Sequence, residues 1–291
     1  PTQGSQHPET RVPTQGSQHP ETRVPTQGSQ HPMGSPARVA PFPRAAPTGD
    51  TPQMEIHHRF GLEGAAVASG PTIVIDVFRA FSAAAYAFAA GAKRIVLAEG
   101  VDEAIQLAAT VPGAILMGED GGVRPDAFDL GNSPGEIVAD PGALDGKTIV
   151  HRSSSGTRCA RAALSAGAEP SYVASLVIAA ATVRSLEEEN DITIVAAGLG
   201  GVEPAEEDQE CADLLEALFR GRVGGLSETG RRVAASDRAQ FLQTASFTHP
   251  DDIRLCTIVD RFDFAMRAKL EEGRLVVRSV PARDNLPGCH T

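Results

Sequence analysis

Short apolar runs alternate with Ala-rich segments from residue 71 onward. The run Thr72–Ile75 is rich in β-branched residues, which suit a buried strand. Asp76 and Arg79 follow it, and then comes an Ala-rich stretch of high helix propensity that ends at Gly91. This pattern predicts a strand, a charged turn and a helix.

The same alternation continues along the chain. Further strands are predicted at Arg94–Ala98, Ala114–Met117, Lys147–Val150, Tyr172–Ser175, Ile192–Ala196 and Arg274–Val280. Helices are predicted at Val101–Ala109, 156–166, Ile178–Glu189, Glu206–Phe219 and Ser236–Thr244, a loop at Gly224–Gly230, and a helix at Asp251–Ala268. Strands that alternate with helices are typical of an α/β fold with helices on both faces of the sheet, a layered α/β/α arrangement.

The chain also carries an internal similarity at a spacing of 76 residues. Thr72-Ile73-Val74 aligns with Thr148-Ile149-Val150, and Gly91-Ala92 aligns with Gly167-Ala168. In this register Asp76 falls on Arg152, and Arg79 falls on Ser155. We therefore expect two related β-α-β-α-β units whose polar turns lie at the same end of the sheet and face one ligand.

Residues 1–53 differ from the rest in composition. PTQGSQHPETRV occurs twice in succession, and PTQGSQHP follows a third time. So few apolar side chains cannot offset the entropy of ordering, which predicts a disordered tail. A start of translation at Met33 or Met54 is a further expectation for this region. The α/β domain is expected over 54–291, with lobes at about 54–145 and 146–291 as one arrangement.

Charge and cysteine content narrow the classes of function. The formal net charge of −11 argues against a nucleic-acid partner. No apolar run is long enough to span a membrane, and the four Cys are scattered without a CxxC pair, which favours reduced thiols and a cytoplasmic location. The sequence leaves open whether the chain forms a homo-oligomer.

Carboxylates follow several of the predicted strands. Asp76 ends the first strand, Glu119 lies in the Gly-rich turn after the third, and the Glu207-Asp208 pair follows the turn after Ile192–Ala196. Because ligands of open α/β sheets bind beyond the carboxyl ends of the strands, these oxygens are candidate Mg²⁺ ligands. The alternative is structural: Asp76 caps its helix, and Glu207 and Asp208 favour the dipole of theirs.

A hydroxyl-rich turn between a predicted strand and a helix is the candidate anion site. Backbone N–H groups at the start of a helix attract anions, and hydroxyl and guanidinium groups add donors. The residues are Ser153, Ser154, Ser155, Gly156, Thr157 and Arg158. The alternative is an ordinary Ser-rich helix cap.

Other catalytic patterns fit less well. The first strand is followed neither by DxD nor by GxGxxG, and the chain has no GxSxG and no Walker A loop. His151 directly follows a strand, where it serves either as an acid/base group or, more often, as a packed structural residue. Acidic turns beside an anion loop instead favour metal-assisted phosphoryl chemistry.

These segments together resemble the 2-phosphosulfolactate phosphatase family. The resemblance rests on IDVFRA at 75–80, GEDGG at 118–122, FDLGNSP at 128–134, GKTIV with SSSGTR at 146–158, and AGLGG followed by Glu207-Asp208. It covers the chain from Met54 onward and is weakest after Gly221.

The resemblance implies a Mg²⁺-dependent phosphatase that converts 2-phosphosulfolactate to 3-sulfolactate and phosphate, a step of coenzyme M biosynthesis. It implies that Asp76 and Glu119 bind Mg²⁺, with Asp208 as a third ligand or as a group that holds a ligand in place. Arg79 and the 153–158 turn would bind phosphate, and Asn132 and Ser133 would orient the substrate or the attacking water.

Two positions depart from the family pattern. Ser155 stands where the family usually has Asn, and Ile178 stands near a second usual Asn. A lost charge-assisted hydrogen bond costs roughly 1.5–3 kcal/mol. Two alternatives therefore stay open: a phosphatase of this family with a different substrate, and a non-catalytic anion-binding protein.

Overall fold

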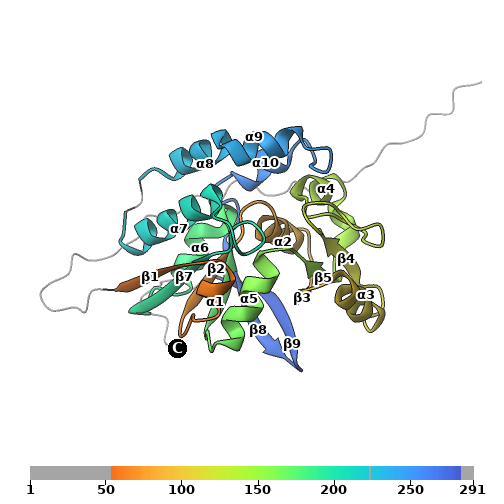
Figure 1. Cartoon of the computed structure of the whole chain (residues 1–291), viewed down its shortest axis with the longest axis horizontal. Helices are drawn as coiled ribbons and strands as arrows, with labels where there is room; N and C mark the ends of the chain where they lie inside the picture. Colours follow the sequence, from red (N-terminus) through yellow and green to blue (C-terminus); the bar gives the residue numbers. More distant parts are fainter. Residues whose placement is uncertain (1–53, 223, 283–291) are drawn as a thin grey trace, which may run out of the picture. The chain divides into compact units, whose positions relative to one another are not determined.

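A nine-stranded sheet forms the centre of the described part of the chain, residues 54–222 and 224–282 of a computed structural model (Figure 1). The predictions for residues 1–53 lie outside this part. The strands are β1 (Glu55–Phe60), β2 (Thr72–Ile75), β3 (Arg94–Ala98), β4 (Ile115–Gly118), β5 (Thr148–Arg152), β6 (Ser171–Ala174), β7 (Asp191–Ala196), β8 (Phe264–Glu271) and β9 (Arg274–Pro281).

The helices lie mainly between successive strands. They are α1 (Gly61–Ala65), α2 (Ala80–Ala89), α3 (Val101–Ala109), α4 (Pro134–Ala139), α5 (Gly156–Ser165), α6 (Ala179–Arg184), α7 (Glu206–Phe219), α8 (Leu226–Ala235), α9 (Asp237–Thr244) and α10 (Asp252–Cys256). Short 3₁₀ helices span Pro141–Leu144 and Leu176–Ile178. No helix within the described residues has the length and apolarity needed to cross a bilayer.

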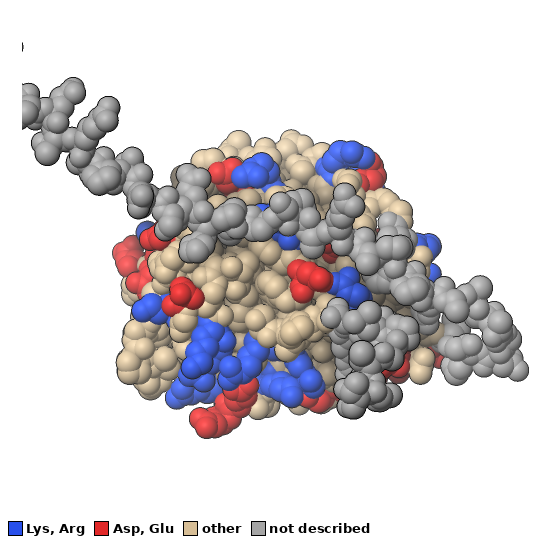
Figure 2. Space-filling view, turned by 180° about the vertical axis from the view of Figure 1, so that it is seen from behind, with Lys and Arg blue, Asp and Glu red and all other residues tan. Residues whose placement is uncertain are grey.

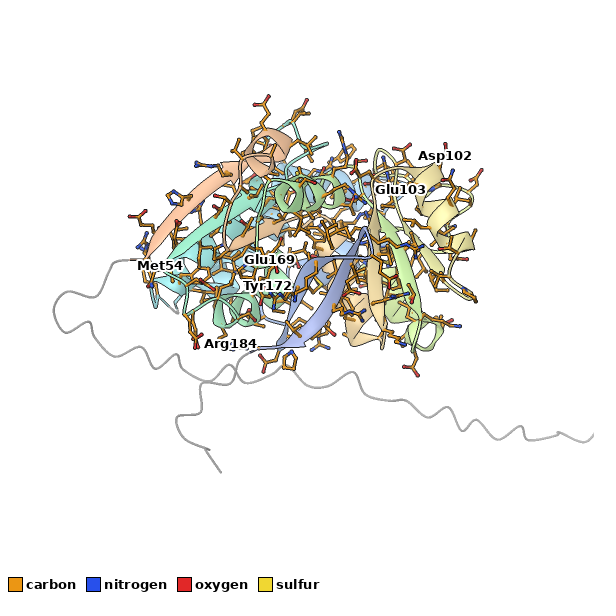
Figure 3. The ribbon with its side chains drawn as sticks, turned by 90° about the horizontal axis from the view of Figure 1, so that it is seen from below. Met54, Asp102, Glu103, Glu169, Tyr172 and Arg184 are labelled. Carbon is orange, nitrogen blue, oxygen red and sulfur yellow. The ribbon has the colours of Figure 1, made fainter. Side chains whose placement is uncertain are left out.

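The sheet contains two groups of parallel strands joined by a hairpin. Its order is β1-β7-β2-β6-β8-β9-β3-β5-β4, with antiparallel pairing only at the three junctions that involve β8 and β9. Figure 3 shows the hairpin from below, between the two groups. The pairing gives the groups opposite directions across the hairpin, so the sheet must curve for the turns after β2 and β5 to meet.

Alternating side chains of the strands build two apolar layers. One face carries Val74, Ile95, Ile149 and Val173, which pack with α2 and α5. The other face carries residues such as Ile73, which pack with α6 and α7. Burial on both faces explains why the parallel strands are apolar throughout, and it confirms the predicted α/β/α layers.

Basic side chains gather on the hairpin side of the domain. Figure 2 shows this group low on the view from behind, where Figure 1 places β8 and β9. A cavity of about 300 Å³ there is lined by Arg94, Arg274 and Arg278 among others. Glu271 of the same hairpin pairs with Arg278 at 2.8 Å, so part of this charge is compensated within the hairpin.

Most elements up to Phe219 agree with the sequence prediction, and Ser236 caps α9 as expected by accepting the Ala239 N–H. The loop predicted at Gly224–Gly230 is wrong, because α8 begins at Leu226. Gly230 lies inside this helix, and the position requires glycine because an added Cβ would lie 2.5 Å from the Thr257 carbonyl oxygen.

The single helix predicted over Asp251–Ala268 is also wrong. The α10 helix ends at Cys256, and the chain turns at Asp260, whose φ is 53°. Residues 264–271 then pair along their length with β9. Pairing with a distant partner, rather than local propensity, decides the structure of this segment.

Two further differences concern the start of the domain and its division. The sequence patterns did not predict β1 and α1. Strands from residues 54–145 and 146–291 alternate within one sheet, as in the pairs of β2 with β6 and of β3 with β5, so these ranges are not separate lobes.

Candidate active site

Turns that follow β2, β4, β5 and β7 meet around one cavity of about 520 Å³. The turn after β2 contributes Asp76 and Arg79, and the turn after β4 contributes Glu119–Gly122. The remaining lining residues are Phe78, Asn132, Arg152, Ser154, Ser155, Arg158, Gly198, Leu199, Gly200, Arg238, Leu242 and Phe247. The two related turns therefore face one cavity, as their internal similarity predicts. The expectation that they lie at the same end of the sheet is wrong, because β2 and β5 belong to groups of strands that run in opposite directions.

Asp76 joins the two related turns directly. One carboxylate oxygen accepts the Ala80 N–H at 3.1 Å and the other accepts the Gly156 N–H at 3.0 Å. A Cβ at position 156 would lie 2.7 Å from that second oxygen, so the close approach requires glycine. Asp76 thus anchors the first N–H of α2, as its structural interpretation predicts, and also lines the cavity.

Burial raises the pKa of Asp76 to about 7. The hydrogen bond from Ala80 acts against this rise, and the nearby negative charge of Glu119 adds to it. A carboxylate held in this way beside a second carboxylate attracts a cation, because the cation would relieve both the lost hydration and the repulsion.

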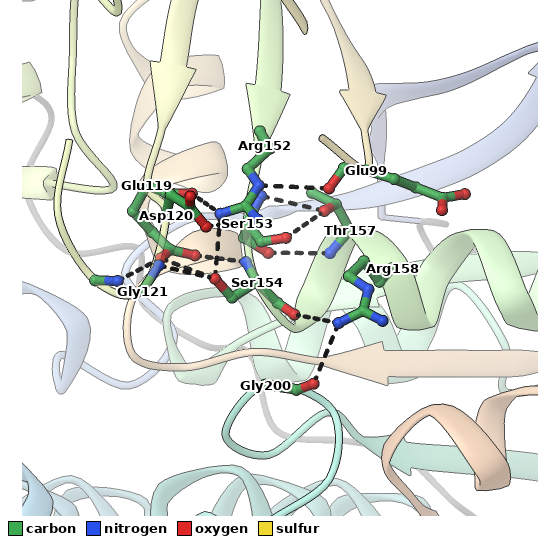
Figure 4. A network of polar contacts seen from close by, with 11 residues as sticks. Glu99, Glu119, Asp120, Gly121, Arg152, Ser153, Ser154, Thr157, Arg158 and Gly200 are labelled. Carbon is green, nitrogen blue, oxygen red and sulfur yellow. Dashed lines mark hydrogen bonds and ion pairs between the residues drawn. The ribbon is translucent and has the colours of Figure 1, made fainter. Parts of the chain in front are cut away.

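Glu119 is the centre of a network that fixes the turn after β5 (Figure 4). Its carboxylate accepts the N–H groups of Ser154 and Gly122, both at 2.5 Å, and the Ser154 hydroxyl at 3.1 Å. The Arg152 guanidinium donates to the Glu119 carbonyl and pairs with Asp120 at 2.9 Å. The backbone around the cavity is therefore held by charged hydrogen bonds.

Arg79 reaches the cavity as half of a buried ion pair. It donates to the fully buried Asp252 at 2.7 Å and to the Gly122 carbonyl at 3.1 Å. The other oxygen of Asp252 accepts the Ser133 hydroxyl at 2.7 Å. Ser133 also caps α4 by accepting the Glu136 N–H, and it does not line the cavity.

Asn132 lines the cavity and is held from behind by His151. The Asn132 Oδ1 and His151 Nε2 atoms are 2.7 Å apart, and His151 is fully buried. Burial lowers the pKa of His151 to about 3, so the ring is neutral. Its Nδ1 has no partner within the described residues.

An unpartnered lone pair costs less than an unpartnered N–H, so Nε2 carries the proton and donates to Oδ1. The Asn132 amino group is then left free to donate toward the cavity. In this arrangement His151 is a packed residue that orients Asn132, which matches the structural interpretation rather than the acid/base one.

The hydroxyls of the 153–158 turn mostly face the protein. The side chains of Ser153 and Thr157 bond reciprocally to each other's backbone N–H groups at 3.1 Å, which caps the start of α5. Ser154, Ser155 and Arg158 line the cavity, whereas Ser153, Gly156 and Thr157 do not. Of the two positions that differ from the family pattern, Ser155 therefore lines the cavity. Ile178 is buried in the apolar core and does not line the cavity.

Asp208 and Glu207 lie behind the cavity lining. Asp208 accepts the Val77 N–H at 2.8 Å and the Gly198 N–H at 2.9 Å, so it ties the turn after β2 to the turn after β7. Burial raises its pKa well above the usual range, as it raises the pKa of Glu207. A role of Asp208 in metal binding stays a prediction. Its contacts favour a group that holds a ligand in place over a direct ligand.

The carboxylates that line the cavity fit one kind of Mg²⁺ site. Within residues 54–222 and 224–282, no three His, Cys, Asp or Glu side chains are placed together as a metal cluster. Mg²⁺ commonly takes one or two carboxylates and completes its shell with water and substrate phosphate. Asp76 and Glu119 match that pattern.

Sequence reasoning missed the contribution of the α8–α10 segment. Arg238, Leu242 and Phe247 line the cavity, and Asp252 compensates Arg79, yet all lie beyond Gly221, where the patterns weaken. A polar, Gly-containing helix gives a weak periodic signal. The capping residue Ser236 two positions before Arg238 was the available indication that a helix begins beside the site.

Comparison with known proteins shows the family of this chain. The family model described as 2-phosphosulpholactate phosphatase matches residues 57–270. A protein of Bacillus subtilis named "Probable 2-phosphosulfolactate phosphatase" is 33% identical over 204 residues, which are 68% of this chain and 86% of the relative. A relative of the same name from Carboxydothermus hydrogenoformans is 31% identical over 219 residues, 71% of this chain and 90% of the relative.

A third relative of that name, from Thermus thermophilus, is 35% identical over 172 residues, 58% of this chain and 70% of the relative. The matched region includes every residue that lines the cavity, from Asp76 to Phe247. The chain therefore belongs to the 2-phosphosulfolactate phosphatase family.

Proposed function

We propose that this chain is a Mg²⁺-dependent phosphatase that hydrolyses a small acidic phosphate monoester, with 2-phosphosulfolactate as the first substrate to test. The observation that carries the proposal is the meeting of Asp76, Glu119 and four arginines around one cavity of about 520 Å³. Family membership supports the same reaction. In that reaction, water replaces the ester oxygen on phosphorus, and the products are an alcohol and inorganic phosphate.

Asp76 and Glu119 are the residues that would hold Mg²⁺. The ion, when bound, would neutralise charge on the transferring phosphoryl group and orient its oxygens. The chain's own part is to keep both carboxylates in place: two backbone N–H groups hold Asp76, and the turn after β5 holds Glu119.

Donors elsewhere in the lining would bind the phosphate. Arg79 and Arg158 both line the cavity, and the backbone at the start of α5 adds the positive end of the helix dipole. Asn132, with its amino group free, would donate to a substrate oxygen or position the attacking water.

The test is phosphate release by the purified full-length protein. We would measure hydrolysis of 2-phosphosulfolactate and other small phosphate monoesters with Mg²⁺ and with EDTA. Turnover with Mg²⁺ and none with EDTA supports the proposal. We expect Asp76→Asn to lower kcat/KM by at least about 100-fold, because a metal-ligating charge is lost.

Asp102→Asn is the matched control, since Asp102 is exposed on α3 and does not line the cavity. Its activity should equal that of the wild type. Binding of inorganic phosphate without turnover of any ester would instead favour the non-catalytic anion-binding alternative. Turnover of other esters but not of 2-phosphosulfolactate would keep the phosphatase and change its substrate.

A further inference from the structure

Arg238 lines the cavity and belongs to the α8–α10 segment, whereas most other lining residues belong to turns that follow strands of the sheet. It is the second residue of α9, directly after the capped start of that helix. Leu242, one turn further along α9, and Phe247, in the following loop, line the same cavity. This segment therefore contributes one cation flanked by apolar side chains.

The four cavity arginines differ in how their charge is compensated. Arg79 pairs with Asp252 at 2.7 Å, and Arg152 pairs with Asp120 at 2.9 Å. Arg158 only approaches the carbonyl oxygens of Ser154 and Gly200, at 3.5 and 3.4 Å. Two of the four positive charges are therefore already matched by carboxylates of the protein.

Arg238 has the least complete set of partners among them. Its Nε is shielded from solvent and has no hydrogen-bond partner within the described residues. Its guanidinium stacks 5.1 Å from the Phe241 ring centroid. It also lies near enough to Glu207 to oppose part of the rise that burial causes in the pKa of Glu207, yet no ion pair joins the two in the described part of the chain. Buried donors without partners are rare in proteins, so this one fits an acceptor that arrives with a ligand.

The form of the guanidinium defines the ligand group that would match it. Its N–H donors form a rigid planar fork that suits two oxygens of a carboxylate or sulfonate. The phosphate has separate candidate donors at Arg79 and Arg158, whereas the N–H groups of Ser154, Gly156 and Thr157 already donate to protein acceptors. Arg238 is therefore free to bind a different anionic group of the same molecule.

We propose that Arg238 is a specificity-determining residue that binds a second anionic group, a carboxylate or sulfonate, on the carbon skeleton of the substrate. The inference rests on the proposed phosphatase function. Leu242 and Phe247 would contact the short carbon skeleton between the two anionic groups. Esters that lack the second group would lose this contact and bind less tightly.

The experiment compares two esters of almost the same shape. Phosphoglycolate carries a carboxylate where ethyl phosphate carries a methyl group. We would measure kcat and KM for both with the full-length wild type and with Arg238→Gln, and express selectivity as the ratio of their kcat/KM values. We expect Arg238→Gln to lower this ratio about 10- to 100-fold, the equivalent of a charged hydrogen bond, mainly through the KM of phosphoglycolate.

Two further variants separate specificity from general damage. Arg231→Gln removes an exposed arginine of the adjacent helix that pairs with Glu228, and it should leave the ratio unchanged. Arg238→Lys keeps the charge without the planar fork, and it should give an intermediate ratio. An unchanged ratio in Arg238→Gln, within twofold of the wild type, would overturn the inference while the phosphatase stands.

A calorimetric titration covers the case in which the wild type hydrolyses neither ester. That result leaves the proposed function to be decided with 2-phosphosulfolactate, and malonate, a small dicarboxylate, then tests Arg238 alone. Binding of malonate by the wild type that weakens at least about 10-fold in Arg238→Gln supports the anion subsite. Equal binding by both proteins, or none by the wild type, refutes it.

Discussion

Replacement of Asp252 by Asn should destabilise the protein through the positive charge that it leaves behind. Asp252 is fully buried and the Arg79 side chain is 5% exposed, so water cannot compensate that charge. One Asp252 oxygen accepts from Arg79 and from the His249 N–H, and the other accepts from Ser133 and from the Gly135 N–H. In Asp252→Asn, an amide NH₂ must face one of these two pairs of donors.

Loss of one partner of a buried ion pair costs about 3–5 kcal/mol, because the other charge stays buried. For a domain of this size, 1 kcal/mol corresponds to a shift in Tm of about 2–4 °C. We therefore expect Asp252→Asn to lower Tm by about 6–20 °C, and to lower activity because Arg79 loses its fixed position.

The neighbouring residue provides a matched control. Asp251 pairs with Arg254 on the same helix, but these side chains are 51% and 64% exposed, so Asp251→Asn should cost at most about 1 kcal/mol. Urea unfolding monitored by circular dichroism measures both variants. A free energy of unfolding for Asp252→Asn within about 1 kcal/mol of the wild type would refute the reasoning, because it would mean that Arg79 is compensated elsewhere.

Two further predictions concern residues that support the site. Gly156→Ala should destabilise by about 1–3 kcal/mol and lower kcat/KM, because its Cβ would lie 2.7 Å from the Asp76 carboxylate; urea unfolding and phosphate release check both effects. His151 is buried with a pKa of about 3, so below pH 6.5 the unfolded chain binds a proton that the folded chain does not. Stability should therefore fall by about 1.4 kcal/mol per pH unit from pH 6.5 toward 3, and His151→Gln, unfolded in urea at pH 7 and pH 5, should lack this component.

The sequence patterns located the candidate site residues that come directly after a strand. Asp76, Glu119 and the 153–158 turn each come directly after an apolar run, and all three turns meet at the cavity. Each of these segments is decided mainly by its own residues, since a strand end needs only a few polar positions.

The contacts between segments could not be read in this way. The bond from Gly156 to Asp76 spans 80 residues, and the Arg79–Asp252 pair spans 173. Such pairing depends on how the sheet curves around the β8–β9 hairpin, and the hairpin itself lies in a segment whose local sequence favoured a helix. Within residues 226–256 only α9 was predicted with its bounds, and the contacts that Arg238 and Asp252 make at the site again involve distant segments.

The charged side chains of the cavity differ in whether the protein itself fixes them. Carboxylates that belong to the sheet turns, Asp76 and Glu119, are fixed by backbone N–H groups, so they are placed before any ligand arrives. Arg79 is fixed by Asp252 in the same way, whereas Arg238, on the α8–α10 segment, has no such partner in the described part of the chain. If both proposals hold, reaction chemistry and substrate selection depend on different residues of this cavity. Substitutions of Asp76 should affect turnover of every ester, and substitutions of Arg238 should change which ester is preferred.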